Sequence, residues 1–172
     1  MRKLFSWLRP PPGAEAASLY GALVAAARDP HWYREGKVPD TLDGRFGLLS
    51  TLIALTVLRL ERGEEEAVRG SVALTEAFIA DMDAQMREEG FDAGLGKQVR
   101  SMVGALAARV ERWRFAGEEE VEADQWREAA RWSLFRDAQP DEGALTYVSE
   151  QLRRFAERID GEPDSDLLRG AL

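Results

Sequence analysis

The chain contains no cysteine, and His31 is the single histidine among its 172 residues. The absence of cysteine excludes disulfide bonds, iron–sulfur ligation and thiol catalysis. One histidine cannot supply the Glu-x-x-His pairs of di-iron bundles, and it argues against a zinc site or stable haem ligation. No Gly-x-Ser-x-Gly motif is present to carry a serine nucleophile. We therefore expect no metal, no cofactor and no enzymatic activity.

Basic residues and long apolar runs are also scarce. Lys and Arg number 23 against 31 Asp and Glu, which gives a net charge of −8 at pH 7. Binding to a nucleic-acid backbone needs clustered basic residues, so we expect no nucleic-acid partner. The longest apolar run, Phe46–Leu58, is shorter than the roughly 18 residues that span a bilayer. No secretory signal is evident, so a cytoplasmic protein is expected.

Most of the chain shows apolar residues at helical spacing, and no segment shows strand-like alternation. These patterns predict an all-α fold, a single helical bundle of about six helices within residues 14–160. The expected helices cover residues 14–28, 40–62, 64–89, 95–113, 121–136 and 145–159. The segment between the first two, His31–Val38, is expected to be a loop.

The helix over residues 40–62 is predicted to be central and buried. It carries two apolar stripes rather than one, which is typical of a helix covered on most sides. Pro39 precedes it, Asp40 is suited to cap its first turn, and Asp43 stands where a carboxylate can bond back to the cap.

The two ends of the chain are expected to differ from the bundle. Residues 1–13 form a short basic amphipathic segment, in which Met1–Arg9 has the composition of a membrane or partner contact. The alternative is a frayed terminus that packs locally, because nine residues are few for an isolated helix. Residues 161–172 are expected to be a flexible tail.

One charge pattern links the second and third expected helices. A short turn near Gly63 joins them, so they should lie antiparallel, with Arg45 level with Asp81 and Asp83. We predict that Arg45 pairs with one of the two aspartates; the alternative is that all three side chains are solvated. The two aspartates point about 200° apart on a helix, so they do not form a simple metal site.

Three segments together resemble the ubiquinol–cytochrome c chaperone family, which comprises assembly factors of the cytochrome bc complex in mitochondria and alphaproteobacteria. They are YREGKVPDTLDGRFGLL at Tyr33–Leu49, VLRL at Val57–Leu60, and FIADMDAQMREEGFDAGLGKQV at Phe78–Val99. The chain departs from the family pattern at Ser50-Thr51, where many members have a histidine, and at Ala108-Arg109, where Gly-Arg is usual. FDAGLG also blurs the usual Gly-Asp.

The resemblance implies a non-catalytic protein that binds newly made apocytochrome b, or another bc-complex subunit, and holds it for assembly. The membrane contact expected through Met1–Arg9 would place the protein on the inner face of the inner membrane. The candidate partner-binding residues are Trp32, Tyr33, Asp40, Arg45, Phe46, Asp81, Met82, Asp83, Met86 and Arg87. Methionines and aromatics of this kind also serve as plain core. The alternative function is a helical module that homodimerises and holds no client.

Overall fold

The computed structural model describes residues 19–88, 95–117, 123–136 and 138–172, and these residues form eight helices and no strand. The helices are α1 (Leu19–Ala27), α2 (His31–Arg34), α3 (Leu42–Glu61), α4 (Glu65–Glu88), α5 (Leu95–Ala116), α6 (Ala123–Leu134), α7 (Glu142–Gly161) and α8 (Asp164–Leu168). The predicted all-α bundle is confirmed, with two short helices, α2 and α8, added to the six expected. The segment Met1–Arg9 lies outside the described residues.

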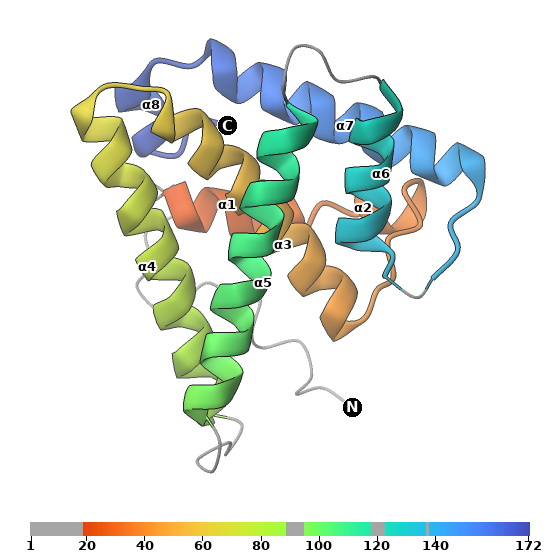
Figure 1. Ribbon diagram of the computed structural model, residues 1–172, viewed down its shortest axis with the longest axis horizontal. Coiled ribbons are helices and arrows are strands. Elements are labelled where there is room, and N and C mark those ends of the chain that lie inside the picture. The colour runs from red at the N-terminus through yellow and green to blue at the C-terminus, as the bar shows by residue number, and fades with distance from the viewer. Residues whose placement is uncertain (1–18, 89–94, 118–122, 137) are drawn as a thin grey trace.

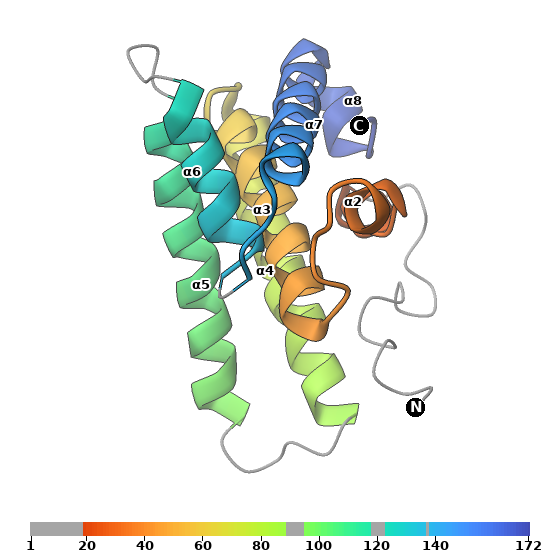
Figure 2. The ribbon, with the colours of Figure 1, turned by 90° about the vertical axis from the view of Figure 1, so that its right-hand side faces the viewer.

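Helix α3 is the centre of the bundle, as its double apolar stripe predicted. It packs against α1, α4, α5, α6 and α7, and Leu48, Leu49, Leu52 and Ile53 are fully buried. Figure 1 shows α3 running through the middle of the molecule, with α7 crossing one end. Figure 2 shows α5 and α6 on one side of α3 and α1 and α2 on the other. No described helix is long and apolar enough to cross a membrane.

Helix α3 is capped by Thr41, not by Asp40 as predicted. The Thr41 backbone is extended, and its hydroxyl accepts a hydrogen bond from the Gly44 amide at 3.2 Å. The Asp40 carboxylate instead pairs with Arg45 one turn into the helix. The helix therefore begins one to two residues later than the sequence indicated.

The expected loop after α1 contains the one-turn helix α2, which folds back onto α1. The Trp32 indole N–H donates to the Ala26 carbonyl at 3.0 Å, and the Tyr33 hydroxyl donates to the Ala27 carbonyl at 2.8 Å. These two bonds satisfy carbonyls at the C-terminal end of α1, which have no partner within that helix. Both aromatic side chains are thus used to fix the α1–α2 corner.

The C-terminal residues form an ordered helix, which differs from the flexible tail expected. Leu167 of α8 is fully buried, and α8 packs on α4. The Arg59 guanidinium at the end of α3 bonds the Ile159 and Glu162 carbonyls and pairs with Asp164 at 2.9 Å. The pKa of Asp164 is lowered, mainly by a hydrogen bond from the Glu64 amide and secondly by the hydrogen bond from Arg59. Five residues are too few to show a helical period, so this packing left no signal in the sequence.

Candidate functional site

A methionine-lined groove opens between the start of α3, the second half of α4 and the first half of α5. Its volume is about 700 Å³. Met82 of α4 forms part of its buried wall, while Met86 and Met102 are half-buried along it. Leu42, in the first turn of α3, is 48% exposed and stands at its edge. The groove is therefore an accessible apolar surface bounded by three helices.

Phe46 and the surrounding polar residues define the rest of this groove. The Phe46 ring packs on Phe78, with ring centroids 5.8 Å apart, so the groove wall is continuous with the buried core. The polar residues that line the groove are Asp43, Gln85, Lys97, Gln98, Ser101, Arg109 and Arg136. An apolar floor with polar groups around it is the usual composition of a protein-binding groove.

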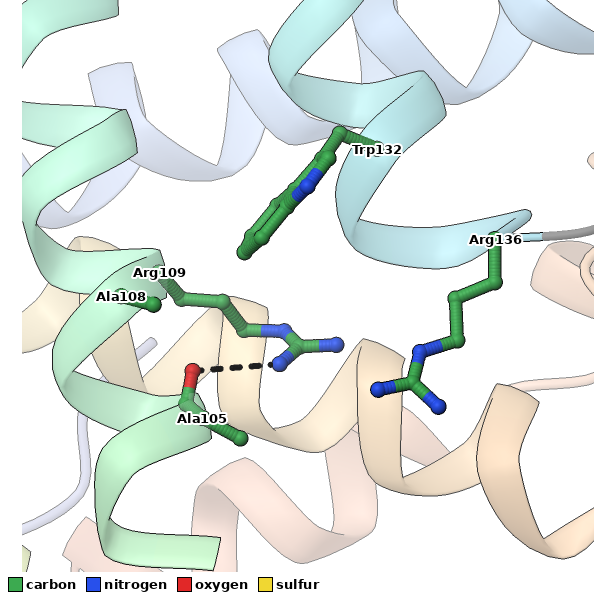
Figure 3. A pocket seen from close by; sticks show the side chains of 5 residues that line it. All are labelled: Ala105, Ala108, Arg109, Trp132 and Arg136. Carbon is green, nitrogen blue, oxygen red and sulfur yellow. Dashed lines mark hydrogen bonds between the residues drawn. The ribbon is translucent and has the colours of Figure 1, made fainter. Parts of the chain in front are cut away.

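A smaller pocket of about 380 Å³ extends the groove toward α6 (Figure 3). It shares Ala105, Arg109 and Arg136 with the methionine-lined groove, and its other lining residues are Ala108 and Trp132. We call this extension the arginine pocket. Its walls come from α5 and from the C-terminal end of α6.

Arg109 is the buried charge of the arginine pocket, with only 4% of its surface exposed. Its guanidinium donates to the Ser133 carbonyl at 3.0 Å and to the Ala105 carbonyl at 3.2 Å, and its Nε–H has no hydrogen-bond partner. The guanidinium also lies 5.6 Å from the Phe46 ring centre and 5.5 Å from that of Trp132. The pKa of Arg109 is lowered to about 10, mainly by burial and secondly by the nearby positive charge of Arg136.

Gly47 permits the close approach of α3 to the end of α6. A Cβ atom at this position would stand 2.8 Å from the Ser133 carbonyl oxygen, closer than carbon and oxygen can pack. It would also lie 3.5 Å from the Arg109 Nη2 atom. The absence of a side chain at Gly47 therefore allows the Arg109–Ser133 hydrogen bond to form against α3.

Three of the predicted partner-binding residues lie together in the groove: Phe46, Met82 and Met86. Trp32 and Tyr33 do not line it, because they pack at the α1–α2 corner on the other side of α3 (Figure 2). Burial raises the pKa of Tyr33 to about 12, although the Arg45 guanidinium, 5.5 Å from its ring centre, opposes the shift.

The predicted charge pair between α3 and α4 is wrong. Arg45 pairs with Asp40. Asp81 accepts hydrogen bonds from the Tyr20 hydroxyl at 2.6 Å and from Gln85. No ion pair among the described residues joins Arg45 to Asp81 or Asp83. The antiparallel register considered only two helices, whereas α1 supplies the hydroxyl that reaches Asp81.

The remaining candidate pair, Asp83 and Arg87, forms an exposed ion pair one turn apart on α4.

Sequence reasoning missed the groove residues Leu42 and Met102, and it noted Arg109 only as part of a departure from the family pattern. Arg136 also went unnoticed, because it lies at the very end of the predicted helix over residues 121–136. Met102 lies within the predicted helix over residues 95–113, where nothing in the local sequence distinguishes the wall of a groove from a face in the core.

Two of the three comparisons with known proteins found a match. The comparison with curated proteins found no match. Among solved structures, the chain is similar to the crystal structure of the Cbp3 homolog from Brucella abortus, with 24% identity and a TM-score of 0.76 over 90% of this chain and 84% of that one. That likeness shows a shared fold. A family model described as ubiquinol-cytochrome C chaperone matches residues 34–172, from the end of α2 through α8. The chain therefore belongs to the ubiquinol-cytochrome C chaperone family.

Proposed function

We propose that this protein is a non-catalytic assembly chaperone of the cytochrome bc complex, and that it holds newly made cytochrome b through the methionine-lined groove. The observation that carries the proposal is an accessible groove with three methionines in a member of this family. Cytochrome b is taken as the client because the family's described role concerns the ubiquinol–cytochrome c complex.

The groove suits an apolar helix of a membrane subunit that has not yet been assembled. Such a helix presents side chains at positions i, i+3, i+4 and i+7, which lie along one face and fit a groove between helices. Methionine side chains are unbranched and polarizable, so they adapt to apolar partners of different shapes. Met86 and Met102 are half-buried rather than sealed in the core, which leaves them able to contact a client.

Asp83 and Arg87 flank Met86 on the same turns of α4, and they remain candidates for polar contacts beside the groove. Trp32 and Asp81 are weaker candidates, because their polar atoms already bond to α1. Tyr33, Asp40 and Arg45 form a cluster of their own at the start of α3. For these three residues a partner role would require a second contact outside the groove.

A charge placed at the edge of the groove tests this assignment. Leu42→Glu puts a carboxylate on an exposed position that lines the groove, whereas Val72→Glu puts the same group on α4 at a position that is 56% exposed and does not line it. Tagged full-length protein is used to recover associated proteins from native membranes. We expect wild-type and Val72→Glu proteins to recover cytochrome b equally, and Leu42→Glu to recover at least about tenfold less, since an apolar client would then face a charge.

Equal recovery of cytochrome b by the Leu42→Glu and Val72→Glu proteins, at matched helicity and thermal stability, would remove the groove as the client site. Failure of the wild-type protein to recover cytochrome b would count against the chaperone proposal as a whole.

The alternative function is homodimerisation without a client. Val68 and Val72 lie one turn apart on α4 and are 41% and 56% exposed, so they offer a small apolar face outside the groove. Light scattering on the same variants separates the two functions. A dimer that Val72→Glu dissociates, combined with no recovery of cytochrome b, would favour the dimerising module.

A further inference from the structure

Two arginines meet in the arginine pocket, and the described residues that line it include no carboxylate. Figure 3 shows the side chains of Arg109, from α5, and Arg136, from the turn after α6, extending toward each other across the pocket. No ion pair within the described part of the chain involves either residue, although many other arginines there pair with Asp or Glu. The two Nη atoms of Arg109 each donate a hydrogen bond to a backbone carbonyl, and its Nε–H has no hydrogen-bond partner.

The burial of Arg109 makes this arrangement costly unless an anion is present. A charged group withdrawn from water is normally paired with an opposite charge, because neutral carbonyls replace only part of its hydration. Among the described residues, the charge that perturbs Arg109 is that of Arg136, which has the same sign, and both burial and Arg136 lower the pKa of Arg109. An anion between the two guanidinium groups would accept hydrogen bonds from their remaining Nη–H groups and relieve the repulsion between them.

The backbone at Arg136 supports a role for its side chain. Its φ is 37°, in the left-handed region that favours glycine or asparagine after the end of a helix. An arginine at such a position strains the backbone, and strain of this kind is found where the side chain has a function. The long cationic side chain reaches back to line both the groove and the pocket.

We infer that Arg109 and Arg136 form a carboxylate-binding subsite at the end of the methionine-lined groove, which takes an acidic side chain carried by the segment that occupies the groove. The inference rests on the proposed function, since the apolar groove supplies the segment that brings the carboxylate. Ala105, Arg109 and Arg136 line both spaces, so a chain lying in the groove leads directly into the pocket.

A carboxylate fits the subsite better than a lipid headgroup does. Arg109 is 4% exposed, so the ligand must project into the pocket rather than lie on the surface of a bilayer. A carboxylate is planar, and its two oxygens can face two guanidinium groups at once.

The test uses labelled amphipathic peptides and fluorescence anisotropy on the full-length protein. Peptides of about 16 residues, long enough for four helical turns, carry an apolar face of Leu, Ala and Phe and amidated ends. A glutamate is moved one position at a time through the last two turns, and each peptide has a matched glutamine version. One further peptide has the glutamines and a free terminal carboxylate, which separates a chain terminus from a side chain as the source of the charge.

The informative variants are Arg136→Asn and Arg112→Gln. Asparagine tolerates the left-handed backbone, so Arg136→Asn removes the cation without adding strain. Arg112 also lies over the ring of the pocket residue Trp132, 4.6 Å from the ring centre, but it lines neither space, so Arg112→Gln is a control of equal charge change. For at least one glutamate position we expect about tenfold tighter binding than for its glutamine partner. Arg136→Asn should abolish the preference for glutamate over glutamine, and Arg112→Gln should retain it.

Several outcomes would overturn the subsite. Equal binding of glutamate and glutamine peptides at every position would do so while leaving the groove intact. Equal losses in Arg136→Asn and Arg112→Gln would show a general effect of charge rather than a site. Arg136-dependent binding to phosphatidylglycerol vesicles, with no peptide preference, would assign the pocket to a headgroup. If no peptide binds at all, the groove assignment fails first and the subsite with it.

Discussion

The hydrogen bond between Tyr20 and Asp81 is the clearest test of whether a predicted partner-binding residue serves the fold instead. Tyr20 belongs to α1 and is 8% exposed, and its hydroxyl lies 2.6 Å from a carboxylate oxygen of Asp81 on α4. Burial, the hydrogen bond to Asp81 and its charge together raise the pKa of Tyr20 above its usual range. The carboxylate of Asp81 is therefore occupied in joining two helices.

The magnitude follows from the chemistry of this bond. A hydrogen bond to a charged partner contributes about 1.5–3 kcal/mol to stability. We expect Tyr20→Phe to lower the free energy of unfolding by that amount, and Asp81→Ala to do the same or more because it leaves a buried hydroxyl without an acceptor. The double variant should cost little more than either single variant, which gives a coupling free energy of about 1.5 kcal/mol or more.

Urea unfolding followed by circular dichroism measures all four proteins at neutral pH. Asp83→Asn is the control, because the Asp83–Arg87 pair is exposed and one turn apart, so its loss should cost about 0.5 kcal/mol or less. A coupling below about 0.5 kcal/mol would refute the structural role of Asp81. In a separate measurement, a folded Asp81→Ala protein that recovers as much cytochrome b as the wild type would show that Asp81 does not contribute to client binding.

The same bond predicts a pH dependence. A tyrosine whose folded pKa lies above its unfolded value of 10.0 contributes stability that is complete below pH 10 and is lost as the pH rises further. Tyr33, with a pKa of about 12, acts in the same direction. The wild-type protein should therefore lose stability above pH 10 more steeply than Tyr20→Phe does, and parallel curves would contradict the raised pKa.

Two further predictions concern the ends of the chain. Leu167→Ala should lower the free energy of unfolding by about 2–5 kcal/mol, because Leu167 is fully buried. The exposed control Val72→Ala should change the free energy of unfolding by about 0.5 kcal/mol or less. Equal effects of the two substitutions would mean that α8 does not pack on α4. Deletion of Met1–Arg9 should reduce co-sedimentation with anionic vesicles, since the segment combines basic groups with Trp and Phe, and unchanged co-sedimentation would exclude it as a membrane contact.

The long helices could be predicted because each repeats an apolar stripe over several turns. The double stripe of α3 correctly indicated burial on most sides, since α3 packs against five other helices. Helices α2 and α8 have four and five residues, fewer than two turns, so neither could show a period. Their positions depend on distant partners, such as Ala26 for Trp32 and Arg59 for Asp164.

The candidate site was predictable only in part. Phe46, Met82 and Met86 lie in the segments that resemble the family, and all three line the groove. Arg109 comes from α5 and Arg136 from the turn after α6, and local sequence spacing does not show how these two elements pack against α3. Arg45 shows the limit of aligning two helices alone. The antiparallel alignment of α3 and α4 placed Arg45 beside Asp81, but its ion-pair partner is Asp40, five residues away in sequence.

The two parts of the groove would contribute different properties to client binding. Methionine side chains supply apolar contact area but do not fix the position of a client helix along the groove. An apolar helix can slide by one turn along such a wall and bury a similar area. A carboxylate that reaches Arg109 and Arg136 can do so from one position only, so it fixes the register and direction of the segment. The acidic molecule as a whole does not attract free anions. Binding of the carboxylate would therefore depend on its delivery by an apolar segment, and the arginine pocket would select among apolar segments rather than capture anions.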